Sequence, residues 1–191
     1  VKMVKHRAAV AAAKHVDIPE YKSGDKIDVD NLKSLIQSKP EPGMLNNPSR
    51  ANAVAEVLNR AKVRLPNPVQ VHGMSHATEM DAVEIDGVQF AWEIDNEQAA
   101  NVIAKWLGAG DVPEALWKSN KGVFFTNQRN NKDAYWEQQY GKEGFTSQAT
   151  GGDGNICVYG TTESMKLTTM NHESGHNLAY KVYGSTAPEG D

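Results

Sequence analysis

One segment near the end of the chain constrains the fold more than any other. Residues 162 to 183 contain no proline and are followed by Gly184, the residue type that most often ends a helix. The segment carries His172, Glu173 and His176 in the pattern H-E-x-x-H. Residues four apart project from the same face of a helix, about one turn from each other. We therefore predict a helix over residues 162 to 183 that presents two imidazoles side by side.

Two imidazoles in this arrangement predict a metal site. Both rings can bind one zinc ion, which accepts each nitrogen at about 2.0–2.1 Å. Glu173 directly follows the first histidine, so its carboxylate is expected beside the ion, where it can accept a proton from a zinc-bound water. His172 and His176 are therefore candidate zinc ligands, and Glu173 is the candidate general base.

The same histidines also fit a second interpretation, a pair with a structural role. Helical spacing places them in a moderately apolar stripe, which we expect to face the core. The members of that stripe are Met165, Thr169, His172, His176, Ala179 and Tyr183. We favour the metal site, because the pattern falls on a predicted helix rather than in a strand or loop.

The motif and the residues before it resemble the zincin metallopeptidases. In that family a short apolar strand leads through a loop into the metal-binding helix, and here residues 155 to 159 form such an apolar segment before H-E-S-G-H-N. Gly175, the small residue before the second histidine, also recurs in zincins. The Gly-rich approach over residues 144 to 154 is most similar to the anthrax lethal factor-like and polymorphic-toxin or phage-associated metallopeptidase domains. The similarity covers residues 144 to 184.

This resemblance implies an α+β, zincin-like fold, with a small mixed sheet packed on the H-E-x-x-H helix and a helical N-terminal part. It implies Zn²⁺ as the cofactor and a protein or peptide as the substrate. For a toxin it also implies a cognate inhibitor or immunity protein as a partner, and a secreted or delivered effector. No signal peptide is recognisable in residues 1 to 13.

A third zinc ligand is needed, because a catalytic zinc ion usually has three protein ligands and one open position for water. Metzincins have a histidine six residues after the second one, but Val182 stands there in this chain. Glu189 and Asp191 are the remaining candidates after the helix. We predict that the chain is a fragment of a longer protein, and that the third ligand is Asp191 or an acidic residue beyond it.

A second pair of histidines, His72 and His76, is also spaced by four. Gly73 and the strand predicted just before the pair argue against a helix here, and no glutamate lies between the two residues. We predict loop histidines, with an accessory metal or substrate role as the alternative. They are the first candidates should the zinc site be completed from elsewhere in the chain.

The chain is predicted to hold two parts. Residues 1 to 42 form a helical extension and linker, and residues 43 to 191 form the zincin-like domain, incomplete at its C-terminus. Helices are expected over residues 4–15, 28–37, 47–62, 95–107 and 111–117, and strands over residues 69–71 and 122–126. Residues 127 to 154 are expected to be a long loop that forms a cleft wall or lid, or else an irregular strand pair fastened by its aromatic residues.

Residues 82 to 94 alternate between apolar and polar side chains around Asp86-Gly87, a pattern that predicts a β-hairpin. The candidates for burial in it are Val83, Ile85, Val88, Phe90, Trp92 and Ile94.

Composition excludes several classes of protein. The net charge is −4 and the basic residues are scattered, so no surface for nucleic acid is expected. The apolar stretches are far shorter than the ~18–20 residues that span a bilayer. The single cysteine, Cys157, cannot form an intrachain disulfide and is predicted to be a buried structural thiol.

These features favour a zinc-dependent endopeptidase. Tyr180 and Tyr183 are candidate donors to the charged intermediate, on chemical type alone. The alternative is a structural or assembly protein, such as a phage head or delivery component, that carries an inactive zincin-like domain. The metal content of the purified protein distinguishes the two.

Overall fold

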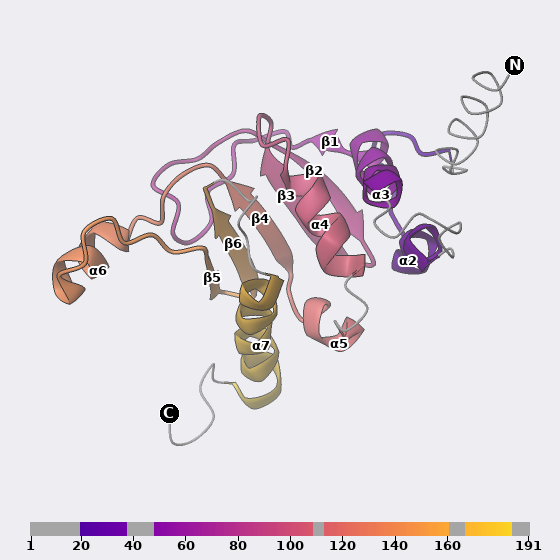
Figure 1. Cartoon of the computed structure of the whole chain (residues 1–191). Helices are drawn as coiled ribbons and strands as arrows, with labels where there is room; N and C mark the ends of the chain where they lie inside the picture. Colours follow the sequence, from indigo (N-terminus) through magenta and orange to yellow (C-terminus); the bar gives the residue numbers. More distant parts are fainter. Residues whose placement is uncertain (1–19, 38–47, 109–112, 161–166, 185–191) are drawn as a thin grey trace, which may run out of the picture.

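The computed structural model describes residues 20–37, 48–108, 113–160 and 167–184 (Figure 1). These residues form an α+β fold with a six-stranded mixed sheet and six helices. The strands are β1 (Val63–Arg64), β2 (Met80–Ile85), β3 (Val88–Glu93), β4 (Gly122–Thr126), β5 (Ala149–Gly152) and β6 (Asn155–Tyr159). The helices are α2 (Val29–Gln37), α3 (Pro48–Ala61), α4 (Ala99–Gly108), α5 (Glu114–Trp117), α6 (Asp133–Tyr140) and α7 (Leu167–Tyr183). The helix predicted over residues 4–15 lies outside the described residues.

The sheet has a parallel centre and antiparallel edges. Its strand order is β1-β2-β3-β4-β6-β5, in which β3, β4 and β6 run parallel. The pairs β1–β2, β2–β3 and β5–β6 are antiparallel. Parallel neighbours need a crossover, and α4 and α5 supply it between β3 and β4. β5 forms one edge of the sheet, with β6 as its one described neighbour.

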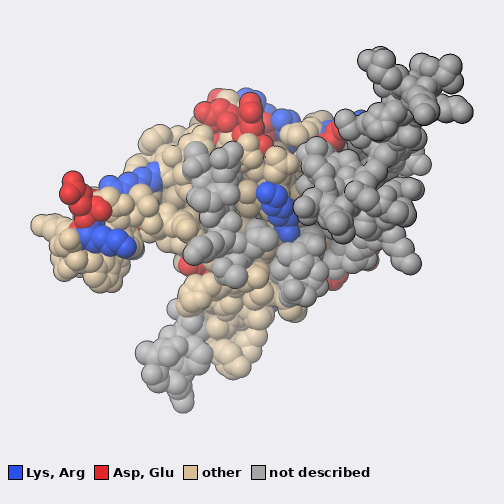
Figure 2. All heavy atoms as spheres, viewed as in Figure 1, with Lys and Arg blue, Asp and Glu red and all other residues tan. Residues whose placement is uncertain are grey.

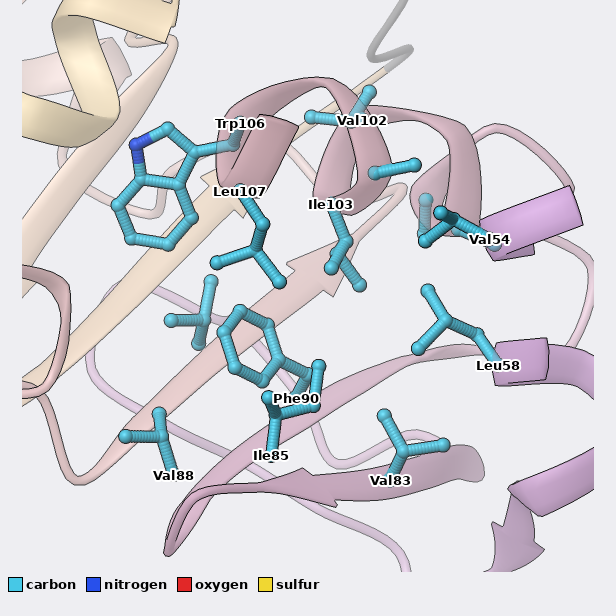
Figure 3. Packing of buried hydrophobic residues seen from close by; sticks show 14 of the residues in the cluster. Val54, Leu58, Val83, Ile85, Val88, Phe90, Val102, Ile103, Trp106 and Leu107 are labelled. Carbon is cyan, nitrogen blue, oxygen red and sulfur yellow. The ribbon is translucent and has the colours of Figure 1, made fainter. Parts of the chain in front are cut away.

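The larger core lies between the sheet and the helices. Side chains alternate between the two faces of each strand. On one face, Ile85 and Phe90 pack with Leu58 of α3 and Ile103 of α4 (Figure 3). The opposite face holds a smaller cluster of buried residues: Met74, Met80, Ala82, Ala91, Phe124, Cys157 and Tyr159. Cys157 is fully buried, which confirms the prediction of a buried thiol.

The predicted hairpin is confirmed. β2 pairs with β3, and the residues between them, Asp86 and Gly87, have φ values of 46° and 83°. A two-residue turn of this kind needs positive φ at both positions, which Asp-Gly tolerates well. The expected apolar residues are buried except Ile94, which is 47% exposed. Ile94 follows Glu93, the last residue of β3, so the alternation no longer applies to it.

The helix predicted to follow Asp28 is also confirmed and belongs to the larger core. The Asp28 carboxylate accepts a hydrogen bond from the backbone N–H of Asp30 at 2.8 Å, which satisfies one of the amides at the start of α2. Leu32 and Leu35 are buried in the same core as α3 and α4. The predicted boundary at residue 42 lies outside the described residues.

Two local predictions are wrong. Residues 69–71 do not form a strand, since Val69 makes only an isolated bridge with Thr78. Residues 127–154 are not a structureless loop, because they contain α6 and β5. α6 was not predicted because its sequence has no apolar stripe. In the structure, Asp133 is the one buried residue of this helix.

α6 projects from the body of the molecule near β5 (Figure 1). The buried Asp133 carboxylate accepts hydrogen bonds from the backbone N–H and the hydroxyl of Ser147, which ties the start of α6 to the residues before β5. Figure 2 shows acidic and basic side chains next to each other at this end, where Arg129 and Glu137 form an ion pair of 2.8 Å. No described helix is both long and apolar enough to cross a membrane.

Candidate metal centre

The H-E-x-x-H motif lies on α7, as predicted. The helix ends at Gly184, which has a φ of 71° and donates its N–H to the carbonyl oxygen of Tyr180 at 2.8 Å. A left-handed glycine in this position satisfies a carbonyl at the helix C-terminus. The predicted start of the helix, residues 162 to 166, lies outside the described residues.

The prediction of which face of α7 packs against the body is wrong. Met170 and Ser174 are fully buried and Asn177 is 5% exposed, whereas His172 is exposed and His176 is half-buried. The apolar pattern predicted the wrong face because the packed face of α7 carries polar residues that are buried with their hydrogen bonds satisfied. A pattern of hydrophobicity contains no information about such hydrogen bonds. The histidines are therefore not a pair buried in the core.

A network of amide and hydroxyl groups attaches α7 to the segment after α5. Asn120 donates from its amide nitrogen to the hydroxyl oxygen of Ser174 at 2.9 Å. Asn177 donates to the side-chain oxygen of Asn120 at 2.7 Å. On the α4 side, the Trp106 indole N–H donates to Asn171 at 2.8 Å. Satisfied buried polar groups of this kind fix the rotation of a helix about its own axis.

The two imidazoles point toward each other. The Nε2 atoms of His172 and His176 are 3.0 Å apart, and the ring planes are nearly perpendicular at 89°. Two Zn–N bonds of about 2.05 Å would span this 3.0 Å separation at an N–Zn–N angle of about 94°, and a tetrahedral angle would need about 3.3 Å. The pair thus fits two neighbouring positions of one zinc ion after a shift of a few tenths of an ångström.

Glu173 lies against the edge strand β5. A Cβ atom on Gly151 would come within 3.1 Å of the Glu173 Oε2 atom and within 3.2 Å of the Glu173 carbonyl oxygen. These distances are shorter than ordinary carbon–oxygen contacts, so a side chain at position 151 would have to displace Glu173 by a few tenths of an ångström, and glycine allows the close approach without that shift. Glu173 is half-buried, and its side chain lies between α7 and Gly151 of β5.

His72 lies on the other side of the sheet. A Cβ atom on Gly152 would be 3.4 Å from the His72 ring, and His72 Nε2 lies 3.0 Å from the Thr150 hydroxyl. Successive strand residues face opposite sides, so Gly151 faces Glu173 while its two neighbours face His72. The loop prediction for His72 and His76 is confirmed. His72 lies on the opposite face of β5 from Glu173.

The structure does not bring a third ligand to the histidine pair within the described residues. No group of three or more His, Cys, Asp or Glu side chains suited to one metal ion occurs there. Glu189 and Asp191 lie outside the described residues. Tyr180 and Tyr183, the candidate donors, lie on the last two turns of α7 and are 58% and 73% exposed.

Sequence reasoning missed Gly151, Asn120 and Ser174 as residues that position Glu173 and α7. The two consecutive glycines at positions 151 and 152 were the one sequence signal that another part of the chain approaches this backbone closely. Nothing in the sequence indicated the amide network. Comparison of the chain with protein families, curated proteins and solved structures finds no match.

Proposed function

We propose that this chain carries a zinc-dependent endopeptidase site in a zincin-like fold. The observation that supports it most is the 3.0 Å separation of the His172 and His176 Nε2 atoms on α7. Glu173 lies between them in sequence and against an edge strand in space. The order of elements also agrees with this proposal, since strand β6 precedes the motif helix.

Each residue of the motif has one role in the proposed reaction. His172 and His176 would hold the ion, with Asp191 as the proposed third ligand. A zinc ion held there would supply Lewis-acid chemistry, since it would lower the pKa of a water molecule and polarise the scissile carbonyl group. Glu173 accepts the proton of the attacking water and passes it to the leaving amine.

The edge of the sheet favours a peptide as the substrate. No described strand pairs with the outer edge of β5, so its backbone N–H and C=O groups can pair with an extended peptide. Such a peptide would run past Gly151, the residue that Glu173 contacts. An antiparallel pairing is expected, because its hydrogen bonds are the better aligned.

Zinc titration and proteolysis test the proposal together. We expect the wild-type chain, extended at its C-terminus where needed, to bind one zinc ion and to cleave fluorescein-labelled casein. Glu173→Gln should keep the zinc and lose about 10²–10⁴-fold in activity, because it removes the base but no ligand. His176→Ala should lose the zinc.

Two results would contradict the proposal. Near-normal activity of the Glu173→Gln protein would show that Glu173 is not the base. The absence of stoichiometric zinc from the wild-type and the extended protein would favour the alternative, a structural or assembly protein with an inactive site.

A further inference from the structure

The residues on either side of Gly151 are held from the opposite face of β5 by one side chain, that of His72. The His72 Nε2 atom lies 3.0 Å from the Thr150 hydroxyl oxygen and 3.2 Å from the Thr150 carbonyl oxygen. The His72 ring also lies against Gly152, where an added Cβ atom would be 3.4 Å from it. β5 is therefore enclosed between Glu173 on one face and His72 on the other.

The contacts of His72 determine which ring nitrogen carries the proton. A carbonyl oxygen can only accept a hydrogen bond, so Nε2 is the protonated nitrogen and donates to Thr150. The Nδ1 atom is buried and has no hydrogen-bond partner among the described residues. It therefore carries a lone pair, since buried acceptors are left unpaired more often than buried N–H groups.

The hydrogen bonds of His72, Thr150 and Tyr159 close a ring. Thr150 accepts from His72 and donates its own proton to the Tyr159 hydroxyl oxygen, 2.6 Å away. The Tyr159 hydroxyl in turn donates to the His72 carbonyl oxygen at 3.4 Å, a long hydrogen bond. Burial raises the pKa of Tyr159, so this phenol keeps its proton and remains a donor. The ring joins three segments of the chain: the loop that carries His72, β5 and β6.

The loop that carries His72 is itself fixed. Gly73 has a φ of 83°, and a Cβ atom there would lie 1.7 Å from the Tyr159 hydroxyl oxygen, so the loop backbone passes directly over this side chain. The Gly73 carbonyl oxygen accepts a hydrogen bond from the Asn131 N–H at 2.8 Å, and Met74 is 1% exposed. His72 is thus held by its own loop, and it can support the strand from outside.

β5 depends on such support. It has four residues, two of them glycine, and β6 is its one described neighbour in the sheet. Glycine has the greatest backbone freedom of any residue, so the position of Gly151 is set by contacts from outside the strand. Gly151 lies against both the carbonyl oxygen and the carboxylate of Glu173. A displacement of β5 would therefore reach the carboxylate of the candidate base.

We propose that His72 is a positioning residue for Glu173. By holding Thr150 and Gly152 on one face of β5, it keeps Gly151 against Glu173 on the other face and so fixes the direction of the carboxylate. This role requires no contact of His72 with metal or substrate. The inference rests on the proposed endopeptidase function and adds to it a residue that acts through the edge of the sheet.

Steady-state cleavage of fluorescein-labelled casein by the zinc-loaded protein tests this role. His72→Leu removes the hydrogen bonds of the imidazole and should lower kcat about 10- to 100-fold, with KM and zinc affinity unchanged, because a misdirected base affects the chemical step alone. His72→Gln should retain most of the activity, since its amide nitrogen can donate in place of Nε2. His76→Leu is the control, because His76 is exposed and its described hydrogen bonds are those of its backbone.

A double-variant cycle separates positioning from a general loss of stability. In a Glu173→Gln background no base is left to direct, so adding His72→Leu should lower the residual activity less than about twofold. A loss as large as in the wild-type background would show that His72 acts on the fold as a whole and would overturn the inference.

Thr150→Val is a milder disruption of the same ring, because it removes the hydroxyl and keeps the branched shape of the side chain. It should also lower kcat, whereas Thr150→Ser, which keeps the hydroxyl, should not. An unchanged kcat in both His72→Leu and Thr150→Val would overturn the inference while the endopeptidase proposal stands.

Amide hydrogen exchange, followed by mass spectrometry, tests the support of β5 without any activity. Residues 149–152 should exchange about tenfold faster in His72→Leu than in His76→Leu. Equal exchange in the two variants would overturn the inference whatever the activity. Faster exchange in a protein whose wild type cleaves no casein would support His72 as the residue that holds β5 and contradict the endopeptidase.

Discussion

The contact between Gly151 and Glu173 can be tested by adding a single methyl group. In Gly151→Ala the new Cβ would lie 3.1 Å from Glu173 Oε2 and 3.2 Å from the Glu173 carbonyl oxygen. The carboxylate can rotate away, but the carbonyl belongs to the helix backbone, so α7 or β5 has to shift. Excess atoms in a packed site of this kind cost about 1–3 kcal/mol.

Gly152→Ala is the matched control on the next residue of the same strand. Its Cβ would lie 3.4 Å from the His72 ring, an ordinary contact, on the opposite face. Both substitutions reduce the entropy of the unfolded chain and stabilise by about 0.4–1 kcal/mol for that reason. This contribution cancels in the comparison, so Gly151→Ala should be less stable than Gly152→Ala by about 1–3 kcal/mol.

Urea denaturation followed by circular dichroism measures the difference. For a chain of this length we also expect the Tm of Gly151→Ala to lie ~2–10 °C below that of the control. Equal stability of the two variants, or a more stable Gly151→Ala, would refute the packing of α7 on β5 described above. Peptidase activity of Gly151→Ala is a second measurement of the same contact, because a displaced Glu173 should lower kcat without changing the affinity for zinc.

Two further predictions concern the network and the thiol. Ser174→Ala removes the acceptor of the Asn120 amide and should lower the free energy of unfolding by about 1 kcal/mol. Ser75→Ala, at an exposed serine, is the control and should change the free energy of unfolding little. Equal effects of the two substitutions in urea denaturation would contradict the hydrogen-bond network around Asn120. Burial raises the pKa of Cys157 from 9.0 to about 12, so the folded state keeps a proton that the unfolded state loses. The free energy of unfolding should therefore fall as pH rises from 9 to 12, and a Cys157→Ala protein with an equally steep decline would contradict this reasoning.

The sequence by itself determined the local features of this protein. The helix of the H-E-x-x-H motif, its end at Gly184 and the hairpin turn at Asp86-Gly87 all follow from interactions within a few residues. The short separation of His172 and His176 is likewise a local feature, because residues four apart on a helix are neighbours in any fold.

Tertiary structure decided which way these elements face. Apolar periodicity placed the histidines toward the core, but the buried amides and hydroxyls around Asn120 hold the opposite face of α7 against the body. Hydrogen bonds between residues far apart in sequence leave no periodic trace along the chain, so no pattern could have predicted this rotation.

The same limit applies to β5 and to a cavity beside the second half of α7. A strand of four residues with two glycines has little strand propensity of its own, and it forms because β6 supplies its hydrogen bonds. Lys121 and Lys181 lie sixty residues apart in the chain and line one cavity only because the end of α7 passes the segment before β4. Long-range packing therefore determines what surrounds the motif, whereas the motif itself is local.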